Sequence, residues 1–206
     1  MPLVASAAST LRPAPRVRVA GLLVLAALIA PLSSAPAALA SAPRHRCRGA
    51  HVPVNRARPG EMRRAVLCLV NRERRRHGLP RLVASARLDR SAQRWTNAMV
   101  HSDQFTHGSA FMNRISATGF DWSTVGENIA TGFRTPAAVV RAWMRSPGHC
   151  ANILDPAYRE VGTGLSARRI PHASSLVGTW TQDFGRLMGQ RALSTDDGPA
   201  RACYRR

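Results

Sequence analysis

The hydrophobic period of this chain changes from helical to alternating along its length, and this change constrains the fold most strongly. In the earlier part, three segments repeat apolar residues three and four positions apart, the spacing of one face of an amphipathic helix. The three stripes are Met62, Ala65, Val66, Leu69 and Val70; Leu88, Ala92, Trp95 and Met99; and Val139, Val140, Trp143 and Met144. Alternation then takes over at Leu176, Gly178, Trp180, Gln182 and Phe184. Helices followed by a small antiparallel sheet define the α+β class.

Local signals predict where these elements begin and end. Gly78 suits the C-terminus of the first helix. Thr135 followed by Pro136 supplies an N-cap and a first-turn proline for the third helical stripe. A short helix, a strand and a hairpin loop are expected at residues 111–117, 160–165 and 168–175, respectively.

The N-terminus carries the pattern of a secretory signal peptide. Three arginines at positions 12, 16 and 18 precede an apolar run over residues 19–30, and Ala38-Leu39-Ala40 is a small-x-small cleavage pattern. The apolar run is too short to span a bilayer, and no later segment is long and apolar enough to do so. We therefore expect residues 1–40 to be removed after Ala40 and the protein to be secreted, with no transmembrane anchor remaining.

The chain is strongly basic, with a formal net charge of +19 carried by arginine alone, since it contains no lysine. Such a charge favours anionic partners, such as lipid headgroups or acidic wall polymers at the cell envelope. Base composition of the genome and a contribution to solubility would explain the same bias. No basic motif interleaved with aromatic residues is present, so we do not expect a nucleic-acid partner.

Four cysteines, at positions 47, 68, 150 and 203, follow the predicted signal peptide. An even number in an exported chain predicts two disulfides. The spacing permits three pairings. Cys47 with Cys203 would tie the two ends of the domain together, and Cys68 would then join Cys150. A zinc site is disfavoured because the cysteines are far apart in the sequence and lack the clustered spacing of zinc ligands.

Composition also divides the chain into segments. Residues 41–60 are rich in Arg, Pro and Ala, which predicts a flexible basic leader anchored at Cys47. The ordered domain is expected to begin at Glu61. Residues 187–206 are expected to form a loop-like tail tied by Cys203.

Five short motifs occur in a fixed order. They are Phe105-Thr106-His107, Gly126-Glu127-Asn128-Ile129-Ala130, Trp143 with Ser146-Pro147-Gly148-His149, Val161-Gly162-Thr163-Gly164, and Trp180-Thr181-Gln182-Asp183-Phe184. This order resembles the CAP superfamily, which comprises the cysteine-rich secretory, antigen-five and pathogenesis-related-one proteins and is also called the SCP domain. Asn71-x-x-Arg74 resembles the start of its bacterial branch. The resemblance assigns the domain to residues 61–186.

The resemblance implies a fold and a site. The fold is a three-layer α-β-α sandwich, with a small antiparallel sheet between helices. The site is a cleft where two histidines and two acids converge, and His107, Glu127 and His149 match three of these positions. Ser146 occupies the position that corresponds to the second acid, so the set is incomplete. Asn128 is expected to cap or bridge backbone groups around the same cleft, and Gln182 either lines the floor of the cleft or is buried and hydrogen-bonded.

Two imidazoles and a carboxylate also form a partial ligand set for Zn²⁺ or another divalent cation. His107 and His149 are the expected ligands, and Glu127 would act as a ligand or as a general base toward metal-bound water. The same residues would equally form a polar network that shapes the cleft.

Three functions fit these residues, and the sequence leaves open whether the chain is an enzyme. The favoured one is a secreted binding protein whose cleft takes a lipid, a wall polymer or an extracellular protein. The alternative is a metal-dependent, peptidase-like hydrolase acting on extracellular or wall substrates. A third is a structural envelope protein held by charge. The missing second acid and the lack of a nucleophilic Ser or Cys favour binding.

Overall fold

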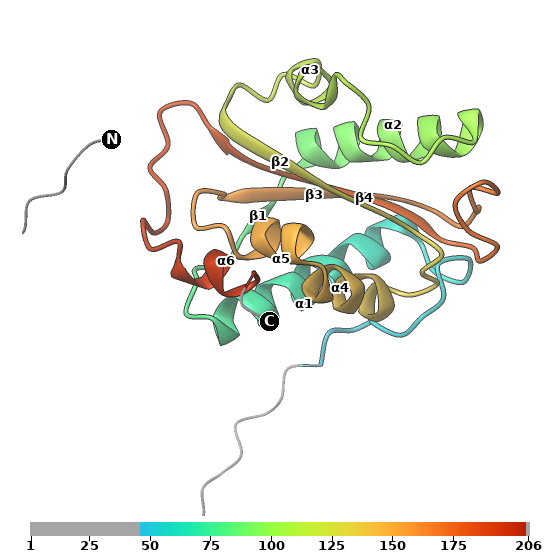
Figure 1. The fold of residues 1–206 in the computed structure, drawn as a ribbon, viewed down its shortest axis with the longest axis horizontal. Coiled ribbons are helices and arrows are strands. Elements are labelled where there is room, and N and C mark those ends of the chain that lie inside the picture. Colours follow the sequence, from blue (N-terminus) through green and yellow to red (C-terminus); the bar gives the residue numbers. More distant parts are fainter. Residues whose placement is uncertain (1–45, 205–206) are drawn as a thin grey trace, which may run out of the picture. The chain divides into compact units, whose positions relative to one another are not determined.

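The computed structural model describes residues 46–204, and it confirms the α+β class (Figure 1). The predicted signal peptide and residues 41–45 lie outside this range. The helices are α1 (Pro59–Arg76), α2 (Ala86–Ser102), α3 (Phe111–Ser116), α4 (Pro136–Arg145), α5 (Pro147–Leu154) and α6 (Gly198–Ala202). The strands are β1 (Val83–Ala84), β2 (Trp122–Thr131), β3 (Glu160–Ser166) and β4 (Thr179–Leu187).

The four strands form one sheet in the order β1-β3-β4-β2. The three long strands, β3, β4 and β2, pair with one another in antiparallel fashion, as expected. The sheet as a whole is mixed, because the two-residue β1 pairs with β3 in parallel. This short pairing uses hydrogen bonds from the amides of Val83 and Ser85 to the carbonyls of Arg159 and Val161.

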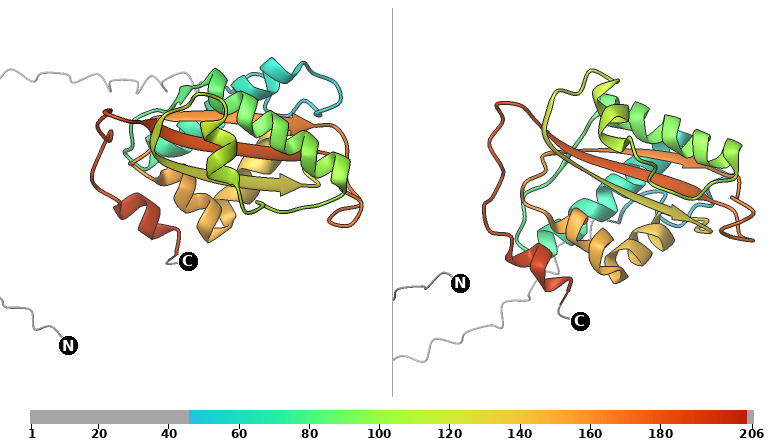
Figure 2. Two further views of the ribbon diagram at one scale, coloured as in Figure 1. Left: turned by 90° about the horizontal axis from the view of Figure 1, so that it is seen from above. Right: turned by 45° about the horizontal axis from the view of Figure 1, so that its top comes forward.

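Helices cover both faces of the sheet, which gives the expected three layers. Figure 1 and the turned views of Figure 2 place α2 and α3 on one side and α1, α4 and α5 on the other. The α2 layer lies directly on β3, where a Cβ on Gly162 or Gly164 would overlap the backbone of α2. The glycines of the Val-Gly-Thr-Gly motif therefore set the distance between these two layers.

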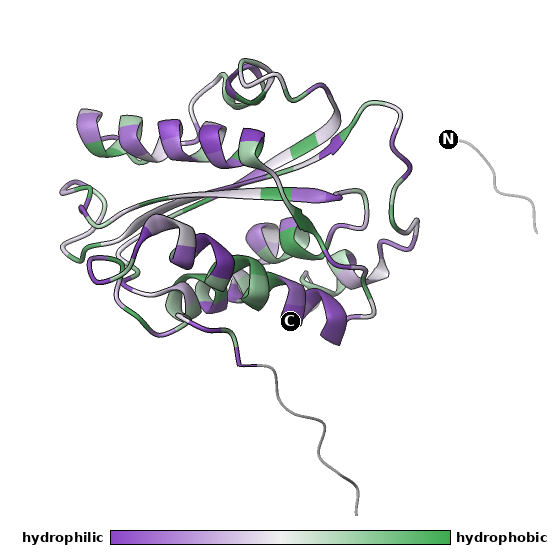
Figure 3. Ribbon diagram, turned by 180° about the vertical axis from the view of Figure 1, so that it is seen from behind, coloured by the Kyte–Doolittle hydropathy of each residue, from purple (hydrophilic) through white to green (hydrophobic). Residues whose placement is uncertain are grey.

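The largest hydrophobic cluster fills the space between the sheet and the layer of α1, α4 and α5. Trp143 of α4 and Trp180 and Phe184 of β4 are among its fully buried side chains. On the opposite side, the ribbon of α2 alternates between hydrophilic and hydrophobic positions in Figure 3, as expected of a helix with one buried face. The predicted helical stripes thus face the sheet from both sides.

The structure contains the two predicted disulfides, but their pairing differs from the one considered above. Cys47 joins Cys68, and Cys150 joins Cys203. The N-terminal segment folds back along α1, which brings the Cα atoms of the first pair to 5.6 Å, and α6 lies beside α5, which brings the second pair to 5.9 Å. Each bond therefore fastens one terminal segment to a neighbouring helix, and the two ends are not tied to each other.

The segment expected to be a flexible leader is packed into the domain from residue 46 onward. Ala50 and Val54 are buried in the main hydrophobic cluster. The amide of Val54 donates to the carbonyl of Arg134 at 2.7 Å, and the amide of Ala137 donates to the carbonyl of Ala50 at 2.8 Å. These contacts, together with the Cys47–Cys68 bond, hold the segment against α1 and α4. Within residues 46–204, no helix is both long and apolar enough to cross a bilayer.

Candidate functional site

Glu127 is the centre of the polar cluster at the β2 edge of the sheet. Its side chain is only 3% exposed, and both carboxylate oxygens are engaged. His107 Nδ1 lies 2.8 Å from Oε1, and Arg114 Nη2 donates to Oε2 at 2.7 Å. His107 comes from the loop between α2 and α3, and Arg114 comes from α3. Glu127 therefore fixes the ring of His107 and pairs with a cation that the sequence did not single out.

Trp95 supports this arrangement from α2. The guanidinium of Arg114 stacks over its ring, with 3.8 Å between Cζ and the ring centroid. The indole Nε1 donates to the carbonyl of Thr106 at 3.0 Å. Gly108, at φ 64°, turns the chain immediately after His107 and lies against the same ring. Trp95, expected to be a core residue, is thus half-buried and holds the loop that carries His107.

A second acid is present at this site, but it comes from β4. Asp183 pairs with Glu127 across the β2–β4 ladder and is almost completely buried. Among the described residues, neither of its carboxylate oxygens accepts a well-formed hydrogen bond, although the hydroxyl of Ser91 on α2 lies close enough to favour the charged form. Burial, and next the negative charge of Glu127, raise the pKa of Asp183 well above its usual value. Ser146 occupies the position where the second acid was expected and is not acidic, whereas Asp183 places a buried carboxyl beside Glu127 whose surroundings favour the neutral form.

His149 lies at the start of α5. Its Nδ1 is 2.9 Å from the hydroxyl of Ser146, the residue that precedes the helix. Burial lowers the pKa of His149, and the nearby positive charge of His107 lowers it further. His149 is therefore neutral at physiological pH. The structure thus brings His149 near His107, the histidine that contacts Glu127.

Asn128 and Gln182 are buried beneath the cleft and hydrogen-bonded, which is one of the two arrangements expected for Gln182. Both are completely buried, so they cannot touch a ligand in this conformation. The amide nitrogen of Asn128 lies 3.3 Å from the carbonyl of His149 and 3.3 Å from Oε1 of Gln182. Asn152 of α5 donates to Oδ1 of Asn128 at 2.9 Å and to the carbonyl of Glu127 at 3.2 Å. This amide network joins β2 to α5 and so sets the position of His149.

The fit of a metal ion to these residues is incomplete. In the part of the chain that the structure describes, no three His, Cys, Asp or Glu side chains converge as a metal-binding group. Each oxygen of Glu127 already contacts a cationic or imidazole partner, Oε1 with His107 and Oε2 with Arg114, and the side chain is only 3% exposed. Each imidazole has Nδ1 engaged and offers only Nε2. Two imidazoles fall short of the three protein ligands of a catalytic zinc site.

Comparison with known proteins assigns the family. The model of the CAP family, described as the cysteine-rich secretory protein family, matches residues 67–184, which is more than half of the chain. The chain belongs to the CAP family. YkwD of Bacillus subtilis strain 168 is 37% identical over 124 residues, which cover 58% of this chain and 45% of YkwD. The chain thus spans less than half the length of this relative.

Two solved structures show the same fold. One is an extracellular protein containing an SCP domain from Bacillus anthracis, with a TM-score of 0.53 and 24% identity over 63% of this chain and 44% of that one. The other is an outer surface protein of Borrelia burgdorferi, with a TM-score of 0.52 and 18% identity over 59% of this chain and 90% of that one. These two likenesses show that the chain shares its fold with bacterial proteins.

Proposed function

We propose that this chain is a secreted binding protein that takes a ligand at the edge of β2, between His107 and His149. The supporting observation is that His107 is presented rigidly and openly. Its side chain is 50% exposed, although a buried carboxylate fixes its ring and the Trp95–Arg114 stack fixes its loop. An exposed but immobilised imidazole loses little conformational entropy on binding, which favours ligand recognition. The ligand is a polar or anionic group of a lipid, wall polymer or extracellular protein.

Secretion is supported by the two disulfides, which persist in oxidising compartments outside the cytosol. The Bacillus anthracis protein of the same fold is described as extracellular. The sequence pattern of residues 1–40 is consistent with export.

Ligand binding is better supported than hydrolysis because neither acidic side chain of the site, Glu127 or Asp183, is placed to act as a general base. Glu127 is only 3% exposed, and its two oxygens bind His107 and Arg114, so it holds these side chains instead of facing a water or a substrate. Asp183 is almost completely buried, so it does not reach a proton of a substrate in the cleft either. Among the described residues, all four cysteines are in disulfides and none offers a thiolate.

A divalent cation remains a weaker part of the proposal. It would be held by Nε2 of His107 and Nε2 of His149, with Glu127 and Ser146 orienting the two rings through Nδ1. Two protein ligands predict weak binding, completed by water or by an acidic group of the ligand.

The test is a binding screen on the disulfide-bonded protein, using anionic lipid vesicles, wall fragments and Zn²⁺ as separate probes. Tryptophan fluorescence and calorimetry report binding. We expect at least one probe to bind saturably and to lose at least about tenfold in affinity, or about 1.4 kcal/mol, in both His107→Ala and His149→Ala. His101→Ala, an exposed histidine at the end of α2, serves as the matched control. Equal affinity of the wild-type protein and the three variants would refute a binding site at the β2 edge.

A further inference from the structure

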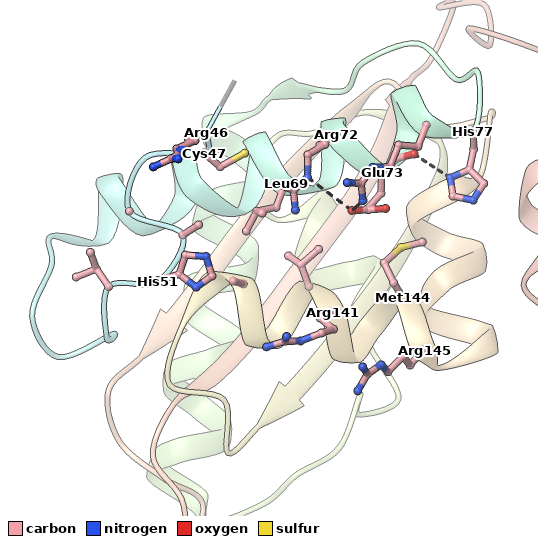
Figure 4. Close-up of a pocket in the computed structure, with 16 residues that line it drawn as sticks. Arg46, Cys47, His51, Leu69, Arg72, Glu73, His77, Arg141, Met144 and Arg145 are labelled. Carbon is pink, nitrogen blue, oxygen red and sulfur yellow. Dashed lines mark hydrogen bonds and ion pairs between the residues drawn. The ribbon is translucent and has the colours of Figure 1, made fainter. Parts of the chain in front are cut away.

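A cavity lies away from the histidine cleft, between α1, α4 and the segment after Cys47. It measures about 910 Å³ and is open to solvent along one side. Figure 4 shows side chains of α1, of α4 and of the segment after Cys47 around it. Its floor is apolar and is formed by Ala50, Val52, Leu69, Ala137, Val140 and Met144. We call this cavity the α1–α4 groove.

The rim of the α1–α4 groove is strongly basic. Five arginines line it, together with two histidines and a single acid, Glu73. The arginines are Arg46, Arg72, Arg76, Arg141 and Arg145. Glu73 already forms ion pairs within α1. Its Oε1 lies 2.8 Å from Nη1 of Arg76 and 3.8 Å from Nε of Arg72. The structure gives no carboxylate within 4.0 Å of the other three arginines in the described range.

The arginines of α4 lack the acidic partner that those of α1 have. Arg72 and Arg76 are four residues apart on α1 and share Glu73, and Arg141 and Arg145 are four residues apart on α4. Like charges at this spacing destabilise a helix, and on α4 no carboxylate in the described range offsets the repulsion. The Nε of Arg72 is also buried without a hydrogen-bond acceptor among the described residues. Features that lower stability in this way are expected where a protein binds something.

The groove also restricts the shape of its ligand. Arginines stand on both rims, so a ligand with negative charges at several points along its length satisfies more of them than a single headgroup does. Guanidinium groups pair with phosphate oxygens in bidentate geometry. The apolar floor between the rims suits a carbon chain that links the charges and disfavours an anion that is polar on every side.

We propose that the α1–α4 groove binds a polyol-phosphate polymer, in which phosphodiesters alternate with short carbon segments. Phosphates would pair with the arginines of α1 and α4, and the carbon segments would lie over Leu69, Val140 and Met144. Such a polymer is an acidic component of a cell envelope, so this groove would hold the protein there. Binding of the polymer in the α1–α4 groove does not depend on which ligand the histidine cleft binds.

The experiment measures the affinity of the disulfide-bonded full chain for a synthetic glycerol-phosphate oligomer by calorimetry. The groove variant is Arg141→Glu with Arg145→Glu. The control variant, Arg87→Glu with Arg94→Glu, changes two exposed arginines of α2 on the opposite layer and lowers the net charge equally. We expect at least about a tenfold loss of affinity in the groove variant and less than about a threefold loss in the control.

Three results would overturn the proposal. The first is no saturable binding of the oligomer to the wild-type protein. The second is an equal loss in the two charge variants, which would show that net charge alone attracts the polymer. The third is tighter binding of an oligonucleotide, of inorganic polyphosphate or of anionic lipid vesicles in the same groove, which would assign it to a different ligand. Thermal unfolding of both variants checks that a lost affinity does not arise from a lost fold.

Discussion

At the scale of single residues, the main feature is a row of four ionisable side chains that become less exposed from the surface inward. His107 is half exposed, Arg114 is largely covered, and Glu127 and Asp183 are buried. A buried carboxylate is stable only when it is paired, and Glu127 is paired with both a cation and an imidazole. Asp183 has no such ion pair, and burial together with the negative charge of Glu127 raises its pKa, which favours its neutral form. The surroundings of the two carboxyl groups therefore differ although the strands place them side by side.

The ion pair of Glu127 predicts a large effect on stability. Glu127→Gln leaves the guanidinium of Arg114 without a carboxylate partner, and we expect a loss of about 2–4 kcal/mol in the free energy of unfolding. Adding Arg114→Met should recover part of this loss, because the unpaired charge is then removed. Urea denaturation of the two single variants and the double variant measures the coupling. Strict additivity would contradict the ion pair.

Asp183 predicts a pH dependence of opposite sign to that of a paired acid. Its pKa is raised in the folded protein, so the unfolded chain gives up this proton more readily. The free energy of unfolding should therefore fall as the pH rises above about 4, the usual pKa of Asp, until the folded pKa is passed. Asp183→Asn is neutral at every pH and should remove this component. We expect the variant to gain at least about 1 kcal/mol relative to the wild-type protein between about pH 4 and about pH 7. Denaturation curves that shift in parallel at both pH values would contradict a protonated Asp183.

At the scale of elements, the close approach of α2 to β3 is the most constrained contact. The backbone of α2 passes directly over Gly162 and Gly164, so any side chain there must displace the helix. The polar residues Asp89 and Gln93 of α2 complete this contact by accepting hydrogen bonds from the amides of Thr163 and Leu165 at 2.7 and 3.2 Å. The position of α2 in turn fixes Trp95 and thus the loop of His107.

Gly164→Ala should therefore destabilise the protein by about 2 kcal/mol or more, because a methyl group would overlap the backbone of Ala92. Gly148→Ala is the control, since no atom lies within 4 Å of the added carbon there. Thermal unfolding compares the two variants. A similar melting temperature for both would show that α2 moves away from the sheet at little cost.

At the scale of the whole molecule, the two disulfides fasten the terminal segments to the layer of α1, α4 and α5. The bonds close loops with sequence separations of 21 and 53 residues. Loop-closure entropy predicts contributions of about 3 and about 4 kcal/mol, respectively. The larger contribution belongs to Cys150–Cys203, which holds the C-terminal segment beside α5.

Replacing Cys150 and Cys203 with alanine should therefore destabilise the protein slightly more than replacing Cys47 and Cys68. The replacement should also expose the segment after β4 to protease, because Cys150–Cys203 is the one disulfide in the described residues that fastens α6 to the domain. Limited proteolysis followed by mass spectrometry tests this. Cleavage after β4 at the same rate in both double variants would show that noncovalent packing is enough to hold α6.

The sequence was sufficient to predict the helices with clear stripes, because their period is set by one buried face. The strand β2 was harder to recognise. Residues 126–130 are buried without interruption, and its polar residues Glu127 and Asn128 point toward partners from opposite layers. Such a strand shows no alternation. The predicted start of the last strand was also too early. The alternation begins at Leu176, but β4 begins at Thr179, and the residues before it belong to the preceding loop.

The sequence by itself determined the α+β class, the family to which the chain belongs and the presence of two disulfides. These follow from local period, from motifs in order and from an even number of cysteines. Only the tertiary structure decided which cysteines pair, that residues 46–58 belong to the packed domain, and that Asp183 stands beside Glu127. The register between β2 and β4 brings these two acids together from distant parts of the chain. Neighbours of this kind are fixed by strand pairing and layer packing, which no local pattern encodes.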